Sequence, residues 1–186
     1  MIKITGGVLK NKKLQSISDF VRPTSSLKRE AFFSIIQSYA MKKSMNLFKN
    51  KIFLDLYAGI GTMGIEAISR GFEQAIFVEN NIQVIKILKK NCKYLCLENS
   101  YEIIEKDVLN LNTDINFNNI SVVYIDPPYF KYDIEEILLN LQKVLKNKTI
   151  VTVETSSSHK FNFPKKMQVI NEKKYGKTKL CFFELS

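Results

Sequence analysis

Residues 52–64 run Ile-Phe-Leu-Asp-Leu-Tyr-Ala-Gly-Ile-Gly-Thr-Met-Gly, and this stretch decides the fold of the 186-residue chain. The apolar run that begins at Ile52 predicts a buried strand. The glycines predict a tight turn, and residues 63–70 have the composition of a helix. Strand, glycine turn and helix N-terminus together form a place where backbone approaches a ligand without an intervening Cβ. The stretch therefore predicts a pocket for a nucleotide-like cofactor.

The rest of the chain alternates between strand and helix patterns. We expect further strands near residues 75–78, 101–105, 120–125 and 149–154, with amphipathic helices near 80–95 and 134–145. Two final strands, 167–173 and 179–185, are expected to turn at Tyr175-Gly176. This order predicts an α/β, Rossmann-like fold: a seven-stranded, mostly parallel sheet with an antiparallel C-terminal hairpin.

An N-terminal extension precedes that core. Gly6-Gly7 between two short alternating runs predicts a β-hairpin turn, and Pro23, Thr24 and the serines after it are helix-start signals. The helix that follows has apolar residues at helical spacing, namely Leu27, Ala31, Phe32, Ile35, Ile36 and Tyr39. We expect one domain over 1–186, with 1–45 as the extension and 46–186 as the core.

A second motif, Asp126-Pro127-Pro128-Tyr129, directly follows the strand expected near residues 120–125. The two prolines fix φ and remove two donors, so the Asp126 carboxylate and the Pro127 carbonyl are presented rigidly as acceptors. Such acceptors can hold an exocyclic amine and stabilise positive charge on its nitrogen, while Tyr129 stacks on the base. The alternative is a tight structural turn with Tyr129 in the core.

Acidic residues fall at successive strand ends, where ligands gather in a parallel sheet. They are Asp55, Glu79, Asp107 and Asp126. Glu79 suits the ribose hydroxyls of S-adenosylmethionine, and Asp107 with the Val108 N–H suits its adenine. One rival is a dinucleotide-dependent oxidoreductase, because Gly59-x-Gly61-x-x-Gly64 followed by Glu79 matches that fingerprint. Hydride transfer has no use for Asp126–Tyr129, which weighs against it.

Positive charge is concentrated near the N-terminus. The formal net charge is +10, of which residues 1–50 carry +8 from ten basic and two acidic residues. This concentration favours a polyanion-binding arm over a merely solvated lysine-rich face. Lys28 and Arg29 open a helix where its dipole disfavours cations, and such local conflicts tend to mark sites.

The cysteines, the single histidine and the lack of a long apolar run limit the classes of protein that the sequence can encode. Cys92, Cys96 and Cys181 form no CxxC pair, which favours reduced thiols in a cytoplasmic protein. His159 is the single histidine, so no metal site is expected. No run approaches the 18 apolar residues of a membrane span and no signal peptide is visible at Met1, so we expect no membrane contact.

The chain resembles the class I methyltransferases, and within them the RsmD family, which makes N2-methylguanine in bacterial 16S ribosomal RNA. The resemblance covers almost the whole chain. Its marks are Ile4-Thr5-Gly6-Gly7, Arg22-Pro23-Thr24, Arg29-Glu30-Ala31-x-Phe33, Asp55-Leu56-Tyr57-Ala58-Gly59-x-Gly61, Glu66-Ala67-x-Ser69-Arg70-Gly71, Val78-Glu79, Asp126–Tyr129 and Tyr175-Gly176-x-Thr178. It departs from the family pattern at Leu27-Lys28, where a basic residue usually comes first.

The resemblance implies the following sites. S-adenosylmethionine would bind to Asp55, Tyr57, Ala58, Gly59, Gly61, Glu79, Asn80, Asp107, Val108 and Asp126, and catalysis would fall to Asp126, Pro127, Pro128 and Tyr129. RNA would contact Lys10, Lys12, Lys13, Arg22, Pro23, Thr24, Lys28 and Arg29. The partner would be 16S rRNA in an assembled or assembling small subunit, and the enzyme a monomer.

Two alternatives stay open at this point. A DNA or RNA adenine-N6 methyltransferase shares the Asp-Pro-Pro-Tyr motif, and guanine is preferred over adenine on the resemblance alone. A non-catalytic RNA-binding protein would explain the charge but not a complete cofactor pocket.

Overall fold

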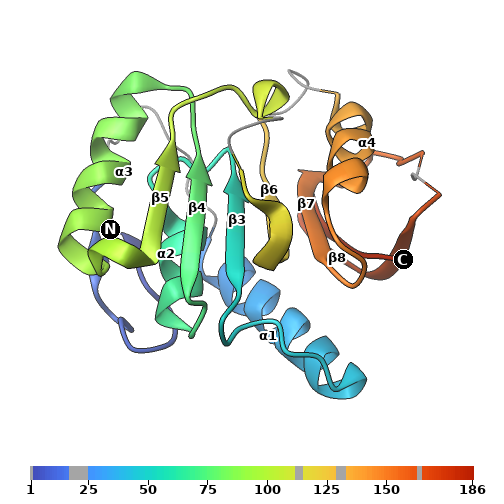
Figure 1. Ribbon diagram of the computed structural model, residues 1–186, viewed down its shortest axis with the longest axis horizontal. Coiled ribbons are helices and arrows are strands. Elements are labelled where there is room, and N and C mark those ends of the chain that lie inside the picture. Colours follow the sequence, from blue (N-terminus) through green and yellow to red (C-terminus); the bar gives the residue numbers. More distant parts are fainter. Residues whose placement is uncertain (1, 17–24, 112–114, 129–132, 163–164) are drawn as a thin grey trace.

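The computed structural model describes residues 2–16, 25–111, 115–128, 133–162 and 165–186. A seven-stranded sheet runs through it in the order β5-β4-β3-β6-β7-β9-β8 (Figure 1). The first five strands of that order are parallel, whereas β9 is antiparallel to both of its neighbours. The strands are β3 (Ile52–Leu56), β4 (Gln74–Val78), β5 (Tyr101–Ile104), β6 (Ile120–Ile125), β7 (Ile150–Ser156), β8 (Met167–Tyr175) and β9 (Thr178–Leu185). The predicted sheet, including its antiparallel hairpin, is confirmed.

Helices cover both faces of the sheet because the central strands are apolar on both sides. One face packs against α1 (Ser26–Lys43), α2 (Thr62–Ser69) and α3 (Ile82–Leu95), the other against α4 (Ile134–Val144). Short 3₁₀ turns lie at Glu98–Ser100, Val108–Asn110 and Phe117–Asn119. No helix in the described part of the chain is both long and apolar enough to cross a membrane.

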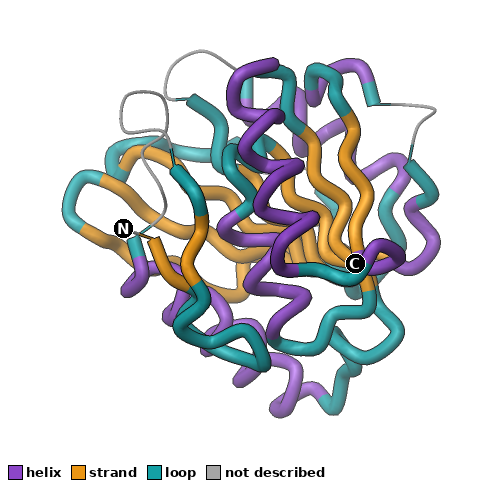
Figure 2. The backbone as a smooth tube through the Cα atoms, turned by 90° about the vertical axis from the view of Figure 1, so that its left-hand side faces the viewer, coloured by secondary structure: helices purple, strands orange, loops and turns teal. Residues whose placement is uncertain are grey.

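The N-terminal hairpin is shorter than predicted. β1 (Ile2–Lys3) pairs antiparallel with β2 (Lys13–Leu14) beside the main sheet (Figure 2). Gly6-Gly7 is not a simple turn, because both glycines press against the end of α2. A Cβ on Gly7 would lie 1.8 Å from the Ser69 carbonyl oxygen, and the Ser69 hydroxyl donates to the Gly6 carbonyl at 2.6 Å. The glycines therefore permit close packing of the loop on the helix.

The buried face of α1 differs from the predicted stripe. Leu27 is 66% exposed, whereas Phe32 and Ile36 are buried as predicted, together with Arg29, Phe33 and Ala40. Ser25 caps the helix by accepting the Lys28 N–H, as the hydroxyl-rich sequence predicted. A cluster of aromatic rings joins this face to the sheet, with Phe32 in edge contact with Tyr124 at 5.2 Å between centroids.

Glu66, which is fully buried in α2, ties the N-terminal extension to the core. It accepts from Arg29 Nε at 3.0 Å, from Arg70 Nη2 at 2.8 Å, and from the Thr5 backbone and hydroxyl. Arg29 Nη2 also donates to the Lys3 carbonyl at 2.6 Å. Three of the sequence motifs that carry the family resemblance therefore meet in one buried polar network, hereafter the Glu66 network.

Candidate active site

The glycine loop between β3 and α2 has an unusual backbone. Tyr57, Gly59 and Gly61 have φ values of +62°, +57° and +87°. Positive φ costs little for glycine but strains a tyrosine, and such strain concentrates at functional sites. The Asp55 carboxylate accepts the Gly64 N–H at 2.9 Å and so fixes the start of α2 against the end of β3. The loop is held in one conformation at the carboxyl edge of the sheet.

Glu79 closes this loop from the neighbouring strand. Its Oε2 accepts the Gly59 N–H at 2.9 Å, and its Oε1 accepts the Asn80 and Asn81 N–H groups at 3.0 and 2.9 Å. Three of the about four acceptor positions of a carboxylate are then in use, and the one that remains is on Oε2. Glu79 thus combines a structural role with one remaining acceptor position for a ligand hydroxyl.

The next strand end joins the same edge. Asn80 Nδ2 donates to Asp107 Oδ2 at 3.0 Å, so the ends of β4 and β5 are linked directly. Asp107 Oδ1 accepts the Leu109 N–H at 3.0 Å and caps the 3₁₀ turn that contains the buried Val108. Glu79, Asn80 and Asp107, which the sequence assigned to one site, therefore lie together.

Asp126 lies at the carboxyl end of β6, on the other side of β3 from Glu79 and Asp107. Its N–H donates to the Leu56 carbonyl at 3.4 Å, so strand geometry continues to the end of β6. Burial raises the pKa of the Asp55 carboxyl well above its usual range, and the charges of Asp126 and Glu79 raise it further, against the lowering effect of the Gly64 N–H. The three acids thus share one electrostatic environment. Pro127 is buried and Pro128 exposed, whereas Tyr129 lies outside the described residues.

Asp55, Gly61 and Gly64 also have packing roles around the glycine loop. Asp55 is only 2% exposed, and its observed partner is the loop backbone. A Cβ on Gly61 would lie 2.6 Å from Leu88 Cδ1, and one on Gly64 would lie 2.3 Å from Phe77 Cε1. Both glycines are therefore required for the approach of α2 to α3 and β4, whatever the loop binds.

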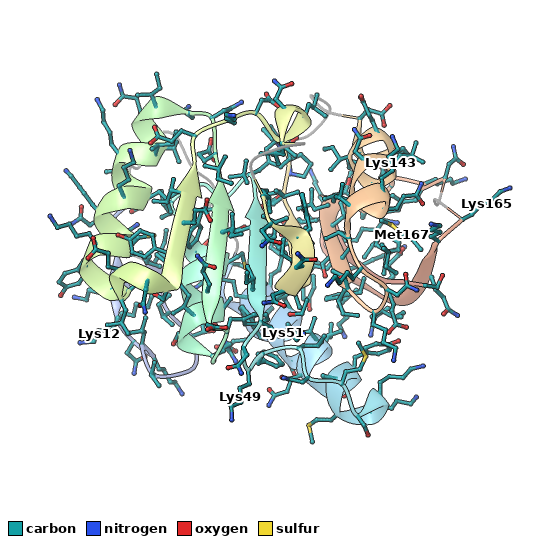
Figure 3. The ribbon with its side chains drawn as sticks, in the orientation of Figure 1. Lys12, Lys49, Lys51, Lys143, Lys165 and Met167 are labelled. Atoms are coloured by element: carbon teal, nitrogen blue, oxygen red, sulfur yellow. The ribbon has the colours of Figure 1, made fainter. Side chains whose placement is uncertain are left out.

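Among the residues assigned to RNA, those that the structure describes differ in burial and pairing. Arg29 is 2% exposed within the Glu66 network, so its assignment as an RNA contact is wrong in this structure. Lys28 is paired with the buried Glu154. Lys10, Lys12 and Lys13 are exposed, and Figure 3 shows Lys12 below the strands, at the opposite end from their carboxyl edge. Arg22, Pro23 and Thr24 lie outside the described residues.

Sequence reasoning missed two buried polar residues near the site. Glu154, at the end of β7, accepts from Tyr124 Oη at 2.8 Å and pairs with Lys28. Glu154 follows the strand-end rule that found the other acids and could have been included on that ground. Asn91 binds the Gln15 backbone through both side-chain atoms and donates to the Ile60 carbonyl at 3.0 Å. A buried asparagine on a helix gives no such signal in the sequence.

A separate hollow of about 480 Å³ lies between α1 and the N-terminal loop, with Phe33, Met41, Met45, Phe48 and Arg70 among its lining residues. Phe48 precedes β3 and Arg70 precedes β4, so this hollow is at the amino ends of the strands. It is distinct from the carboxyl-edge site. Within the described ranges, histidine, cysteine and acidic side chains form no group of three that could hold a metal ion.

The sheet order, the antiparallel β9 and the glycine loop after β3 together define a class I, Rossmann-like methyltransferase fold. Solved structures share this arrangement. A Haemophilus influenzae protein superimposes with a TM-score of 0.79 at 26% identity, covering 99% of this chain and 98% of the other. An RNA methyltransferase from Salinibacter ruber, solved with S-adenosyl-L-homocysteine, gives 0.64 at 13% identity over 88% and 94% of the two chains.

Sequence comparisons are more specific than the fold. The model of the family described as "Conserved hypothetical protein 95" matches residues 2–184. Ribosomal RNA small subunit methyltransferase D from Buchnera aphidicola is 30% identical over 176 residues, which cover 92% of this chain and 87% of the relative. The chain belongs to this family, the RsmD family that its motifs indicated.

Proposed function

We propose that this protein transfers a methyl group from S-adenosylmethionine to the exocyclic N2 of a guanine in 16S ribosomal RNA. The observation that carries the proposal is the row of acceptors at one sheet edge: Glu79 and Asp107 at one end, the Asp126 carboxylate and Pro127 carbonyl at the other. Relatives named as small-subunit rRNA methyltransferases, including that of Buchnera aphidicola, support the substrate class.

The residues at the edge suit the two parts of this reaction. S-adenosylmethionine supplies an electrophilic methyl group, and Glu79, Asn80 and Asp107 offer acceptors and amide groups for its ribose and adenine. We assign Tyr57, Ala58 and Gly59 to its amino-acid portion, because their backbone turns away from β3 with positive φ at both ends. A glycine loop at a helix N-terminus suits such a ligand.

The Asp126 carboxylate and the Pro127 carbonyl would determine which nitrogen of the base reacts. The amine of guanine has two N–H groups and a lone pair delocalised into the ring. Hydrogen bonds from both N–H groups to Asp126 and Pro127 would orient that lone pair and stabilise the positive charge that grows on nitrogen. A carboxylate charge on Asp126 would serve this purpose, and Tyr129 would stack on the base.

RNA would bind through residues 1–45 of a single methyltransferase domain, acting in the cytoplasm as a monomer on the assembled or assembling small subunit. Because Lys12 lies toward the amino ends of the strands (Figure 3), Lys10, Lys12 and Lys13 would contact RNA some distance from the reacting base. The substrate must then be large enough to reach around the side of the domain, as ribosomal RNA is.

The test offers the purified protein labelled S-adenosylmethionine with naked small-subunit RNA, assembled small subunits or duplex DNA. We expect label on guanine N2, most rapidly in assembled subunits, and loss of label with Asp126→Asn, which preserves shape but removes the charge. Label on adenine or preferential label on DNA would refute the substrate. Cofactor binding without any transfer would favour a non-catalytic RNA-binding protein.

A further inference from the structure

A buried carboxylate, that of Glu154, lies beside Asp126 at the carboxyl ends of two adjacent parallel strands. β6 and β7 pair Ile125 with Val153, so Asp126 and Glu154 are the next residues on neighbouring strands. Such strands run about 4.8 Å apart. Tyr124 shows which side of the sheet Glu154 occupies, since its hydroxyl donates to Glu154 Oε2 at 2.8 Å. Residues 124 and 126 leave a strand on the same side. Glu154 and Asp126 therefore face one region.

The environment of Glu154 is unusual for a core position. Its side chain is 4% exposed, and its counter-ion is Lys28 in the first turn of α1, which is 15% exposed. Burying a carboxylate is costly unless it is paired, and a lysine at a helix start opposes the helix dipole. The Lys28–Glu154 ion pair thus combines a buried carboxylate with a cation at a helix start, and each of these is unfavourable by itself. Conflicts of this kind concentrate where function requires them.

Guanine has a chemical feature that matches this second acceptor. Its N2 amine is adjacent to the N1–H donor on the same edge of the base, whereas the ring nitrogen beside the adenine amine is an acceptor. A site that selects guanine needs one acceptor for the amine and another for N1–H. Resting on the proposed function, we propose that Glu154 accepts the N1–H of the target guanine while Asp126 and Pro127 hold its amine.

The ion pair leaves room for this contact. A carboxylate accepts about four hydrogen bonds, and Lys28 and Tyr124 account for one on each oxygen. Lys28 is the more exposed partner, and RNA brings phosphates that can replace Glu154 as its counter-ion. Turning of the Lys28 ammonium to a phosphate frees Oε1 for the base. Adenine is rejected because its N1 lone pair would face the carboxylate.

The test compares guanine with 2-aminopurine, which keeps the 2-amino group but lacks N1–H. Either base is placed at the mapped target position of small-subunit RNA by splint ligation, and methyl transfer is timed with the full-length protein. Wild type should methylate guanine faster by about 10-fold or more, the discrimination of a good base contact. Glu154→Gln should slow guanine by a similar factor but not 2-aminopurine, because its amide can donate to the bare N1.

Controls separate base reading from support of the fold. Glu154→Asp keeps an acceptor and should keep the guanine preference even where its rates fall. Glu172→Gln, which alters a lysine-paired glutamate on the outer strand β8, should leave both rates unchanged. Equal slowing of both bases by Glu154→Gln, with unchanged cofactor affinity, would make Glu154 structural and overturn the inference. An unchanged preference would also overturn it. If wild type labels no guanine N2 at all, the proposed function fails first.

Discussion

Replacing Glu66 by glutamine should destabilise the protein strongly, because Glu66 neutralises two arginines inside the fold. Glu66 is 0% exposed, Arg29 2% and Arg70 20%. Removing one partner of a buried ion pair costs about 3–5 kcal/mol, chiefly from the charge left behind. Glutamine retains one acceptor oxygen, so we expect the lower end, about 3 kcal/mol. In a domain of this size that corresponds to a fall in Tm of roughly 6–12 °C.

The assay is thermal and urea unfolding followed by circular dichroism. Glu105→Gln is the matched control, because its pair with Lys89 is about half exposed on both sides and contributes at most about 1 kcal/mol. Arg70→Gln should fall between the two, since Arg70 retains some contact with water. A loss below about 1 kcal/mol for Glu66→Gln would refute the argument. It would mean that Arg29 finds water or another partner, and would reopen Arg29 as a residue available to RNA.

Three further predictions concern the site and its surroundings. Glu79→Ala should weaken S-adenosylmethionine binding by about 1–3 kcal/mol in calorimetry, and unchanged affinity would remove Glu79 from the site. Asp55→Asn should stabilise the protein at neutral pH, because the pKa of Asp55 is raised in the folded state. Stability contributed by such a group is present in acid and is lost as the pH rises through the folded-state pKa. If the free energies of unfolding of wild type and variant change in parallel with pH, the raised pKa of Asp55 is contradicted. Charge reversal of the loop lysines Lys10, Lys12 and Lys13 should make the plot of log RNA affinity against log salt concentration less steep, by roughly 0.7–0.9 in slope for each lost phosphate contact. The same change at Lys86, Lys90 and Lys93 of α3 should leave the slope unaltered.

The fold could be predicted because its signals are local. Residues 52–64 specify strand, turn and helix by composition alone, and Tyr175-Gly176 marks the turn between the last two strands, where Gly176 has φ +59°. The parallel arrangement follows from alternating strands and helices, since each crossover returns the chain to the same edge. The same rule predicts Glu79, Asp107 and Asp126 at one edge of the sheet.

Which cations reach the surface was decided by the tertiary structure. Lys28 and Arg29 are adjacent in the sequence, yet one pairs with Glu154 and the other with Glu66, 37 residues further along. Helix geometry points the two side chains in different directions. What each side chain meets there depends on the packing of β7 and α2 against α1. Sequence spacing therefore cannot tell a buried arginine from one that is available to a phosphate.

By itself, the sequence determined the class of fold, the carboxyl-edge row of acids and the glycine turn, because these depend on periodicity and on the backbone freedom of single residues. The tertiary structure alone decided that Gly6 and Gly7 pack against the end of α2 and that Lys12 lies toward the amino ends of the strands. It also decided that Glu154 stands next to Asp126. These outcomes depend on which elements become neighbours, and burial and charge pairing between distant segments select those neighbours when the chain packs.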